Sequence, residues 1–293
     1  MLSIAIYNNK INYISSKRSR NNLLVTNHGT SIYDSLDNAI NKSTKDILNK
    51  EKIKNESISY LIDSQLCTFN EIFCENEESL NFHENLSGNN KLSSHIDSYY
   101  YPIGTRDDHY LGIHIDKSIK QRLLNIIEDS NCSFSSLGIG IFSSEILARY
   151  VFQAKALDDY LILRFITSNL IETLYINDGL LMSYGKYRIS NGKIKAIKVI
   201  GDIENKKKIG DCLDKIILKK NKTTSMIQKV FIYQSQGQSP IVKDLLKSKN
   251  NTNLILLNLF NYSNSKEYQV TISDSFKHLS YAELGNIFRG IYV

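Results

Sequence analysis

The sequence repeats one order of elements: three successive strand patterns followed by an amphipathic helix, first near the N-terminus and again after residue 158. In the first occurrence, apolar residues alternate or cluster as they do in strands at 2–7, 11–15 and 23–26. Apolar residues at helical spacing then predict a helix over 32–52. This duplicated order constrains the fold strongly, because it predicts two α/β lobes of similar topology.

The second occurrence has strand patterns at 160–166, 169–176 and 180–189. Asp178 and Gly179 lie between the second and third strands, and an Asp-Gly pair is typical of a two-residue β-hairpin turn. After these strands we expect a helix at 205–220, a strand at 229–234, a helix at 241–247, a strand at 254–259 and a final helix at 281–291.

Between the two repeats, strand and helix patterns alternate. We expect strands at 58–62, 95–101, 110–115 and 137–141, and helices at 117–130 and 145–153. The segment at 70–90 is rich in Asn, Glu and Ser and has only weak helical character around 73–86. The strand at 23–26 is predicted to break at Asn27. Ser143 and Ser144 are predicted to cap the helix at 145–153.

The charge of the chain argues against a nucleic-acid-binding role. The formal net charge is +6, from 36 Lys and Arg against 30 Asp and Glu. This excess is modest for 293 residues, and nucleic-acid-binding domains usually concentrate their charge on one face. The densest basic stretches, at 206–208 and 215–222, fall on one predicted amphipathic helix and are typical of a solvated helix face. We therefore expect no nucleic-acid partner.

Cysteine spacing and hydropathy indicate a metal-free protein of the cytoplasm. The four Cys residues lack CxxC spacing and have no accompanying pair of His residues, so a zinc site is not expected. No apolar run approaches the roughly 20 residues of a membrane span, and the N-terminus lacks the pattern of a secretory leader. We expect a protein that does not insert into a membrane and reaches one only through a partner.

Several groups of polar residues are assigned ordinary structural roles. Asp63 and Glu71 are interpreted as surface loop residues, because no further motif accompanies these two carboxylates. His109 and His114 lie near acidic residues on one strand and its preceding turn, whereas metal ligands converge from several elements. We therefore predict no catalytic residue and no metal ligand.

Three stretches of the chain carry a resemblance to known proteins. They are residues 110–150, ending in SFSSLGIGIFSSEILARY; residues 158–189, DDYLILRFITSNLIETLYINDGLLMSYGKYRI; and the end of the chain, with KVFIYQSQGQSPIVKDLL and SYAELGNIFRGI. In the order of their strands, turns and helices, these stretches resemble the actin-like ATPase superfamily. Within it they are similar to the PilM family of type IV pilus assembly proteins.

The resemblance implies an α/β, two-lobed actin-like fold, in which a ribonuclease H-like unit is duplicated and a small subdomain is inserted in the first lobe. It implies a first lobe at residues 1–152, with the inserted subdomain at about 68–131, and a second lobe at 153–293. The helix at 281–291 is expected to close back toward the first lobe.

The chain departs from this family at the turns that would hold nucleotide phosphates. Members that hold ATP open each lobe with an Asp-x-Gly turn, whose glycine lets backbone N–H groups approach phosphate and whose carboxylate manages Mg²⁺. Neither turn of this chain contains Asp or Gly, and one glycine remains in the adenine-side loop. If nucleotide binds, the residues that would hold it are Asn8, Asn9, Lys10, Thr167, Ser168, Asn169, Gly237 and Gln238. We expect neither ATP hydrolysis nor tight binding of ATP with Mg²⁺, and no other cofactor.

The expected function is that of a non-catalytic cytoplasmic scaffold, a pseudo-ATPase of a pilus or secretion assembly. The resemblance implies binding of the short cytoplasmic tail of an inner-membrane protein in a groove near the inserted subdomain, and it leaves homo-oligomers open. The alternative is an ATP-binding actin-like protein that switches or polymerises with nucleotide, with phosphate bound by Thr167, Ser168 and Asn169. A small-molecule kinase of the sugar-kinase branch ranks last, because no catalytic Asp is evident.

Overall fold

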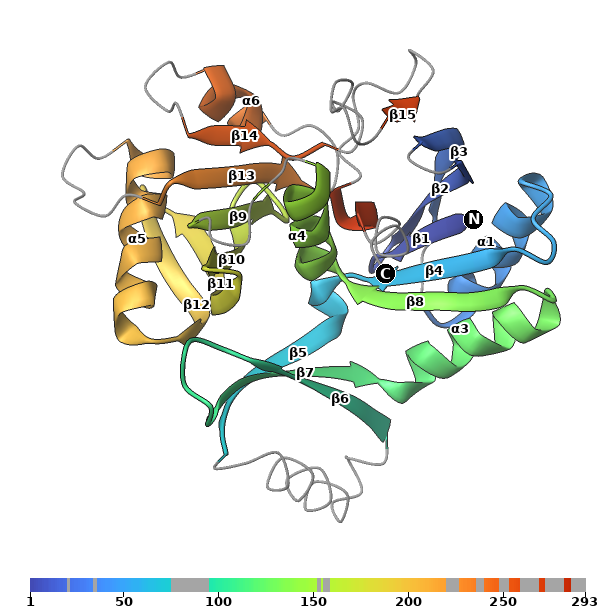
Figure 1. Cartoon of the computed structure of the whole chain (residues 1–293), viewed down its shortest axis with the longest axis horizontal. Helices are drawn as coiled ribbons and strands as arrows, with labels where there is room; N and C mark the ends of the chain where they lie inside the picture. Colours follow the sequence, from blue (N-terminus) through green and yellow to red (C-terminus); the bar gives the residue numbers. More distant parts are fainter. Residues whose placement is uncertain are drawn as a thin grey trace.

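The computed structural model of the chain consists of two lobes that lie side by side (Figure 1). It describes residues 1–19, 22–33, 36–74, 95–151, 154, 159–219, 227–235, 240–247, 253–258, 269–271 and 282–285. Each lobe contains a six-stranded sheet, and helix α4 (Gly140–Val151) lies between the two sheets. A separate three-stranded sheet lies to one side of both lobes.

The sheet of the first lobe has the strand order β15-β3-β2-β1-β4-β8. Strands β1, β2 and β3 pair antiparallel with one another, whereas β4 pairs parallel with both β1 and β8. The elements are β1 (Leu2–Ile6), β2 (Lys10–Ser19), β3 (Asn22–Ile32), α1 (Leu36–Lys50), β4 (Ser57–Ile62), β8 (Ser133–Ile139) and β15 (Gln269–Thr271).

The sheet of the second lobe has the order β12-β11-β10-β9-β13-β14 and the same pairing pattern. Three strands, β9 to β11, are antiparallel, and β13 pairs parallel with both β9 and β14. The elements are β9 (Tyr160–Phe165), β10 (Leu170–Asn177), β11 (Leu180–Ser190), β12 (Lys193–Gly201), α5 (Ile203–Leu218), β13 (Lys229–Gln234), α6 (Pro240–Lys247) and β14 (Leu254–Leu256).

The duplication predicted from the sequence is confirmed by this pairing, since each lobe joins three antiparallel strands to two parallel ones in the same order. Strands β12 and β15 are additional and were not predicted. Asn191 and Gly192, with φ of +51° and +67°, form the turn from β11 to β12. An Asn-Gly pair is a strong hairpin signal, so this extra strand was within reach of sequence analysis.

The third sheet lies between β4 and β8 in the chain and has the order β5-β7-β6. Its strands are β5 (Cys67–Phe73), β6 (Ile96–Pro102) and β7 (His109–Asp116), and helix α3 (Lys117–Asp129) follows β7 directly. The Asp116 carboxylate caps α3 by accepting a hydrogen bond of 2.7 Å from the N–H of Ser118. The weak helix expected at 73–86 falls mostly outside the described residues, and residue 73 belongs to β5 instead.

The predicted break in the third strand of the first lobe is wrong. β3 continues through Asn27 to Ile32, because β2 is long enough to pair with it along this whole stretch. Gly29 lies against the ring of Tyr13, where a Cβ would be only 2.6 Å from a ring carbon. The following helix accordingly begins at Leu36 rather than at residue 32.

The predicted helix cap at Ser143 and Ser144 is also wrong. Both residues are buried inside α4, which begins at Gly140, and the Ser144 hydroxyl donates a 2.6 Å hydrogen bond to the carbonyl of Ile141. Of the helix expected at 281–291, only residues 282–285 are described, and they form a short 3-10 turn. Among the described residues, no helix is both long and apolar enough to cross a membrane.

One hydrophobic core continues across both lobes. It includes Ile4 and Ile62 of the first-lobe sheet, Ile162 and Phe231 of the second-lobe sheet, and Leu284 of the 3-10 turn. The opposite face of the second-lobe sheet forms a second core with apolar residues of α5 and α6. The lobes are therefore held together by the same kind of contact that holds each lobe together.

The end of β12 provides a test of this backbone arrangement. Gly201 has φ of +126°, and a Cβ there would lie 2.6 Å from the carbonyl oxygen of Met182. Gly201→Ala should therefore lower the free energy of unfolding by about 1–3 kcal/mol. Gly210 lies in α5 with open space around it. As the matched control, Gly210→Ala should raise that free energy by about 0.4–1 kcal/mol. Urea unfolding measures the free energy of unfolding of both variants. If the two substitutions changed it in the same direction, the described backbone conformation at Gly201 would be contradicted.

Candidate functional site

Arg164 places a fully buried guanidinium group between the two lobes. It lies near the end of β9, a strand whose residues are all buried. All of them except Arg164 are apolar or aromatic. Tyr160, Ile162 and Arg164 alternate onto one face of the strand, and the first two belong to the core shared by both lobes. A cation in such a position requires partners, because burying an unpaired charge is strongly unfavourable.

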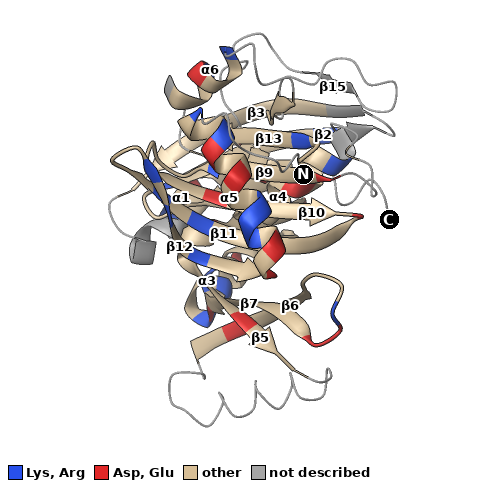
Figure 2. Cartoon of the chain, turned by 90° about the vertical axis from the view of Figure 1, so that its left-hand side faces the viewer, with Lys and Arg blue, Asp and Glu red and all other residues tan. Residues whose placement is uncertain are grey.

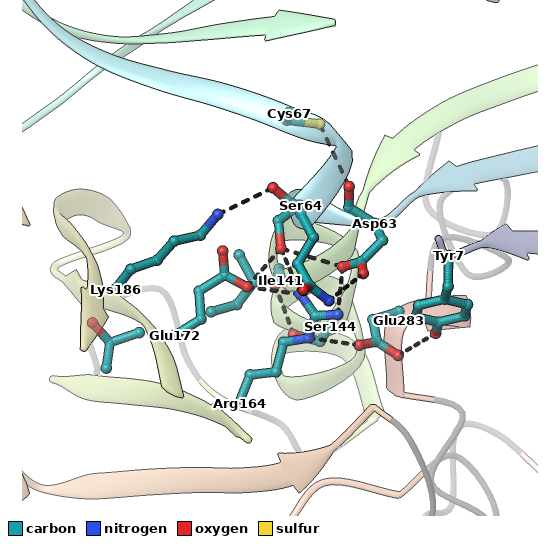
Figure 3. A network of polar contacts seen from close by, with 12 residues as sticks. Tyr7, Asp63, Ser64, Cys67, Ile141, Ser144, Arg164, Glu172, Lys186 and Glu283 are labelled. Atoms are coloured by element: carbon teal, nitrogen blue, oxygen red, sulfur yellow. Dashed lines mark hydrogen bonds and ion pairs between the residues drawn. The ribbon is translucent and has the colours of Figure 1, made fainter. Parts of the chain in front are cut away.

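Three carboxylates surround this guanidinium group (Figure 3). Nη2 lies 2.5 Å from Oδ1 of Asp63 and Nη1 lies 2.7 Å from Oε2 of Glu172. Nε forms an ion pair with Oε1 of Glu283 at 3.0 Å, without the alignment of a hydrogen bond. All three carboxylates are buried. We call Arg164, Asp63, Glu172 and Glu283 the interlobe ionic network.

The network joins three parts of the chain that are far apart in sequence. Asp63 follows β4 in the first lobe, and its N–H donates to the carbonyl of Ile6 at 2.9 Å. Glu172 lies on β10, directly opposite Arg164 in the strand register. Glu283 comes from the 3-10 turn at residues 282–285. A single side chain of the second lobe therefore contacts both the first lobe and this turn.

Neighbouring hydroxyl groups satisfy carboxylate oxygens of the network. Ser64 donates to Oε2 of Glu172 at 2.6 Å, and Tyr184 donates to Oε1 of the same residue at 2.5 Å. Tyr7, at the end of β1, donates to Oε2 of Glu283 at 2.8 Å. Such additional hydrogen bonds are what makes a buried ionic cluster tolerable, because attraction between the charges alone does not offset their lost hydration.

The charges of the network are unbalanced, with one cation facing three carboxylates. Burial alone would lower the pKa of Arg164, but Asp63, Glu283 and Glu172 raise it well above its ordinary value. Burial raises the pKa of Glu283, and the attraction of Arg164 offsets this only in part. Arg164 therefore stays charged, whereas Glu283 binds a proton more readily than an ordinary glutamate.

Gly140, the first residue of α4, makes room for the guanidinium group. A Cβ at this position would lie 3.4 Å from Nη1 of Arg164 and 3.3 Å from the backbone N of Ser64. The first distance is at the limit of ordinary van der Waals contact, whereas the second is tight for a Cβ contact. The absence of a side chain at Gly140 therefore chiefly lets α4 approach the backbone that follows β4, beside the guanidinium group.

The first predicted phosphate turn directly follows Tyr7, which donates to Glu283 of the network. Asn8 and Asn9 are exposed, whereas Lys10 is half-buried. The Lys10 ammonium group approaches the carbonyl of Ser235, in the second lobe, at 3.5 Å. Burial lowers the pKa of Lys10, and the carboxylates of Glu283 and Asp63 oppose this effect in part. The one cation of this turn thus approaches a backbone carbonyl across the interface and also feels the charges of the network.

The second turn is exposed at all three predicted residues, Thr167, Ser168 and Asn169. The Thr167 hydroxyl donates to the side-chain oxygen of Asn169 at 2.7 Å. The remaining predicted nucleotide-binding residues, Gly237 and Gln238, lie outside the described residues. None of the described residues of the two turns therefore forms a hydrogen bond or ion pair with the network, although Arg164 precedes Thr167 by only three residues.

The interpretation of Asp63 as a surface loop residue is wrong. It lies at the carboxyl end of a buried central strand, where its side chain meets the opposite lobe. The sequence patterns assign no role to Arg164, Glu172 or Glu283. An available signal was a charged residue within an apolar strand run, as in YLILRF and LIETLY, because charges there are seldom buried without a partner.

Glu71 and His109 are placed together, but not as a metal site. Glu71, on β5, is half-buried and its carboxylate lies 3.0 Å from Nε2 of His109 on β7. The same oxygen accepts from the N–H of Gly201 at 3.1 Å. The described part of the chain contains no group of three or more His, Cys, Asp or Glu residues that could hold a metal ion. Glu71 therefore links the third sheet to the second lobe.

Comparison with known proteins finds similarity in structure and not in sequence. No protein-family profile and no curated protein sequence matches the chain. Among solved structures, a chain of a PilM-PilN type IV pilus biogenesis complex aligns with all of this chain and with 98% of its own length. The TM-score is 0.61 and the sequence identity is 10%. This match confirms the PilM-like, two-lobed actin-like fold predicted from the sequence.

Two further structures resemble the chain more weakly. The cytoplasmic domain of EpsL, an inner-membrane component of the type II secretion system of Vibrio cholerae, aligns with 97% of this chain and 92% of its own, at 8% identity and a TM-score of 0.43. A Bacteroides thetaiotaomicron protein with an actin-like ATPase fold and unknown function aligns with 90% and 91%, at 12% identity and a TM-score of 0.43. The fold assignment rests on the first, stronger match.

Removing the cation of the network should leave its carboxylates buried and unpaired. We expect Arg164→Met to lower the free energy of unfolding by about 3–5 kcal/mol at neutral pH. Without Arg164 the pKa of Glu283 rises further, so the folded state gains stability as the pH falls and Glu283 is protonated. Urea unfolding should therefore show a smaller loss at pH 5 than at pH 8.

The double variant Arg164→Met/Glu283→Gln provides the control for this pH dependence. It removes one of the three carboxylates, so it should be more stable than Arg164→Met at pH 8 and should show a flatter dependence on pH. An equal loss for Arg164→Met at both pH values would contradict the assigned role of Glu283.

Proposed function

We propose that this chain is a non-catalytic scaffold of a membrane-associated assembly of the pilus or secretion kind. The observation that carries the proposal is the interlobe ionic network, which joins the lobes. It lies beside the two turns that were predicted to hold phosphate if a nucleotide binds. A scaffold requires a fixed arrangement of lobes. A buried network that joins both lobes, with a continuous apolar core around it, favours that property.

The charges of the network also disfavour a bound triphosphate with Mg²⁺. Phosphate sites in proteins present free cations or backbone N–H groups, whereas Arg164 is already surrounded by three carboxylates. Lys10 is directed toward Ser235, and no Asp is present in either turn to manage Mg²⁺. These features support a pseudo-ATPase that uses no cofactor.

The alternative function is an actin-like protein that binds ATP and switches or polymerises with it. The feature that favours it is the exposure of Thr167, Ser168 and Asn169, whose hydroxyl and amide groups could donate to a phosphate. The network makes this the weaker proposal, because a phosphate between the lobes would have to approach its excess negative charge.

The proposed partner is an inner-membrane protein with a short cytoplasmic tail. The similar structure is a PilM-PilN complex, in which a chain of this fold is assembled with another protein. By analogy, we propose that the present chain acts in the cytoplasm, at the periphery of the inner membrane, through such a tail. Direct membrane insertion and nucleic-acid binding are not part of the proposal, and homo-oligomers stay open.

Nucleotide titration distinguishes the two proposed functions. We expect no heat in calorimetry and no shift in melting temperature with millimolar Mg-ATP. If ATP did bind, a hundredfold excess over Kd would add about 2.7 kcal/mol to the free energy of unfolding, which a melting experiment would detect. A micromolar site would overturn the scaffold proposal. Lys10→Ala serves as the locating variant, because a site at the first turn should be weakened by it and a site elsewhere should not.

Tail binding is tested with synthetic peptides. The candidates are the cytoplasmic tails of single-span membrane proteins encoded beside the gene for this chain, with scrambled versions as controls. We expect one tail to bind saturably, at one peptide per chain, in fluorescence anisotropy. If every tail binds no better than its scrambled control, the proposed partner class is wrong.

A further inference from the structure

The interlobe ionic network is one end of a row of polar side chains that crosses the second-lobe sheet. In the strand register, Tyr233 on β13 is opposite Arg164, and Arg164 is opposite Glu172. Glu172 is in turn opposite Lys186 on β11, which is opposite Lys198 on β12. Directly opposed residues point to the same face of a sheet. The row therefore runs from the buried centre of the molecule to the edge of the sheet.

Basic residues dominate this face at the edge. Arg188 lies two residues after Lys186, and it is opposite Lys195; Lys193 is opposite Ser190. We call Lys186, Arg188, Lys193, Lys195 and Lys198 the basic sheet face. Arg188, Lys193 and Lys195 are exposed, whereas Lys186 and Lys198 are half-buried. Figure 2 shows blue segments along β11 and β12, seen from the side of the sheet that α5 covers, which is opposite to the basic sheet face.

The charges of the basic sheet face are not compensated within the described part of the chain. Two like-charged pairs, Lys186 with Lys198 and Arg188 with Lys195, are directly opposed, which destabilises a sheet. Lys186 and Lys198 donate to neutral oxygens, the carbonyl of Ser64 and the side chain of Asn70. No described Asp or Glu forms an ion pair with any of the five residues, and Glu172 is already bound by Arg164.

We propose that the basic sheet face binds an extended acidic segment of a partner protein. In a strand, alternate residues on one face are about 7 Å apart. An extended peptide with carboxylates at every second position would therefore match the spacing from Lys186 to Arg188 and from Lys193 to Lys195. Its carboxylates would continue the alternation of charge begun by Arg164 and Glu172, and they would relieve the repulsion between the opposed cations. This inference does not depend on the proposed scaffold role.

The position of the face favours a peptide over a lipid surface. Lys186 reaches Ser64 and lies over the ring of Phe69, 5.0 Å from its centroid, and Lys198 reaches Asn70. Both lysines thus lie where β5 meets the second-lobe sheet, and a planar bilayer would not reach them. An extended chain could lie along β11 and β12 and contact them together with the exposed residues.

The test uses a fluorescein-labelled ten-residue Glu-Ser repeat as the probe, with a Gln-Ser repeat as the neutral control, in anisotropy at low ionic strength. We expect the acidic peptide alone to bind, with an affinity that falls as salt is added. Arg188→Gln/Lys195→Gln should weaken binding by about fivefold to tenfold. Lys54→Gln/Lys243→Gln removes the same charge from exposed lysines elsewhere and should leave the affinity unchanged.

Three outcomes would overturn the proposal. The first is equal weakening by both double variants, which would indicate attraction by net charge alone. The second is no binding of the acidic peptide at low salt. The third is that the acidic peptide does not bind, whereas the protein binds vesicles of phosphatidylglycerol and phosphatidylethanolamine and Arg188→Gln/Lys195→Gln abolishes that binding. This result would assign the face to a membrane.

The unliganded protein provides an independent check. Because the opposed cations repel each other, Arg188→Gln/Lys195→Gln should melt at a higher temperature than the parent chain at low salt, and the difference should shrink as salt is added. The control Lys54→Gln/Lys243→Gln should not show this stabilisation. A lower melting temperature for Arg188→Gln/Lys195→Gln would show that the charges of the face are compensated, and the proposal would fail.

Discussion

The buried guanidinium group of Arg164 is the constraint on which the arrangement of the two lobes depends. A cation without solvent contact must be surrounded by anions and hydrogen-bond acceptors, and a single strand cannot supply them. Asp63 supplies one from the first lobe, Glu172 one from the adjacent strand and Glu283 one from the 3-10 turn. The charge on β9 therefore requires that three distant segments meet, and the apolar core around them completes the interface.

The same network also sets the electrostatics of the junction between the lobes. Two turns lie near this junction, and the junction itself is occupied by one cation and three carboxylates. The excess of carboxylates supports our proposal that no phosphate binds there, and the hydroxyls of Tyr7, Ser64 and Tyr184 donate within the network. On the outer part of the same sheet the balance is reversed, since cations accumulate there without an ion pair to any described carboxylate. The two ends of one row of side chains thus have opposite electrostatic character.

Much of the fold could be predicted because local patterns agree with it. The alternation at 2–7, the apolar run at 160–166, the Asp178-Gly179 turn and the apolar stripe of α5 each specify an element without reference to the rest of the chain. The errors arose where pairing overrides local signals. Asn27 and Gly29 discourage a strand in isolation, yet β2 offers a full set of backbone partners and β3 continues. The β11–β12 turn, by contrast, carried a readable Asn-Gly signal.

The candidate site was less predictable, because the role of each of its residues depends on the other charged residues that lie close to it in the folded protein. The sequence by itself determined the duplicated order of strands and helices, the absence of Asp and Gly from both phosphate turns, and the presence of charges inside apolar strands. Only the tertiary structure decided which carboxylates Arg164 meets, since Asp63 and Glu283 are separated from it by about a hundred residues. It likewise decided that Lys186, Arg188, Lys193, Lys195 and Lys198 share one face. Hydropathy patterns depend on neighbours in the sequence, so the sequence determined the strands and helices. Ion pairs depend on distances in space, so only the fold decided which charges meet.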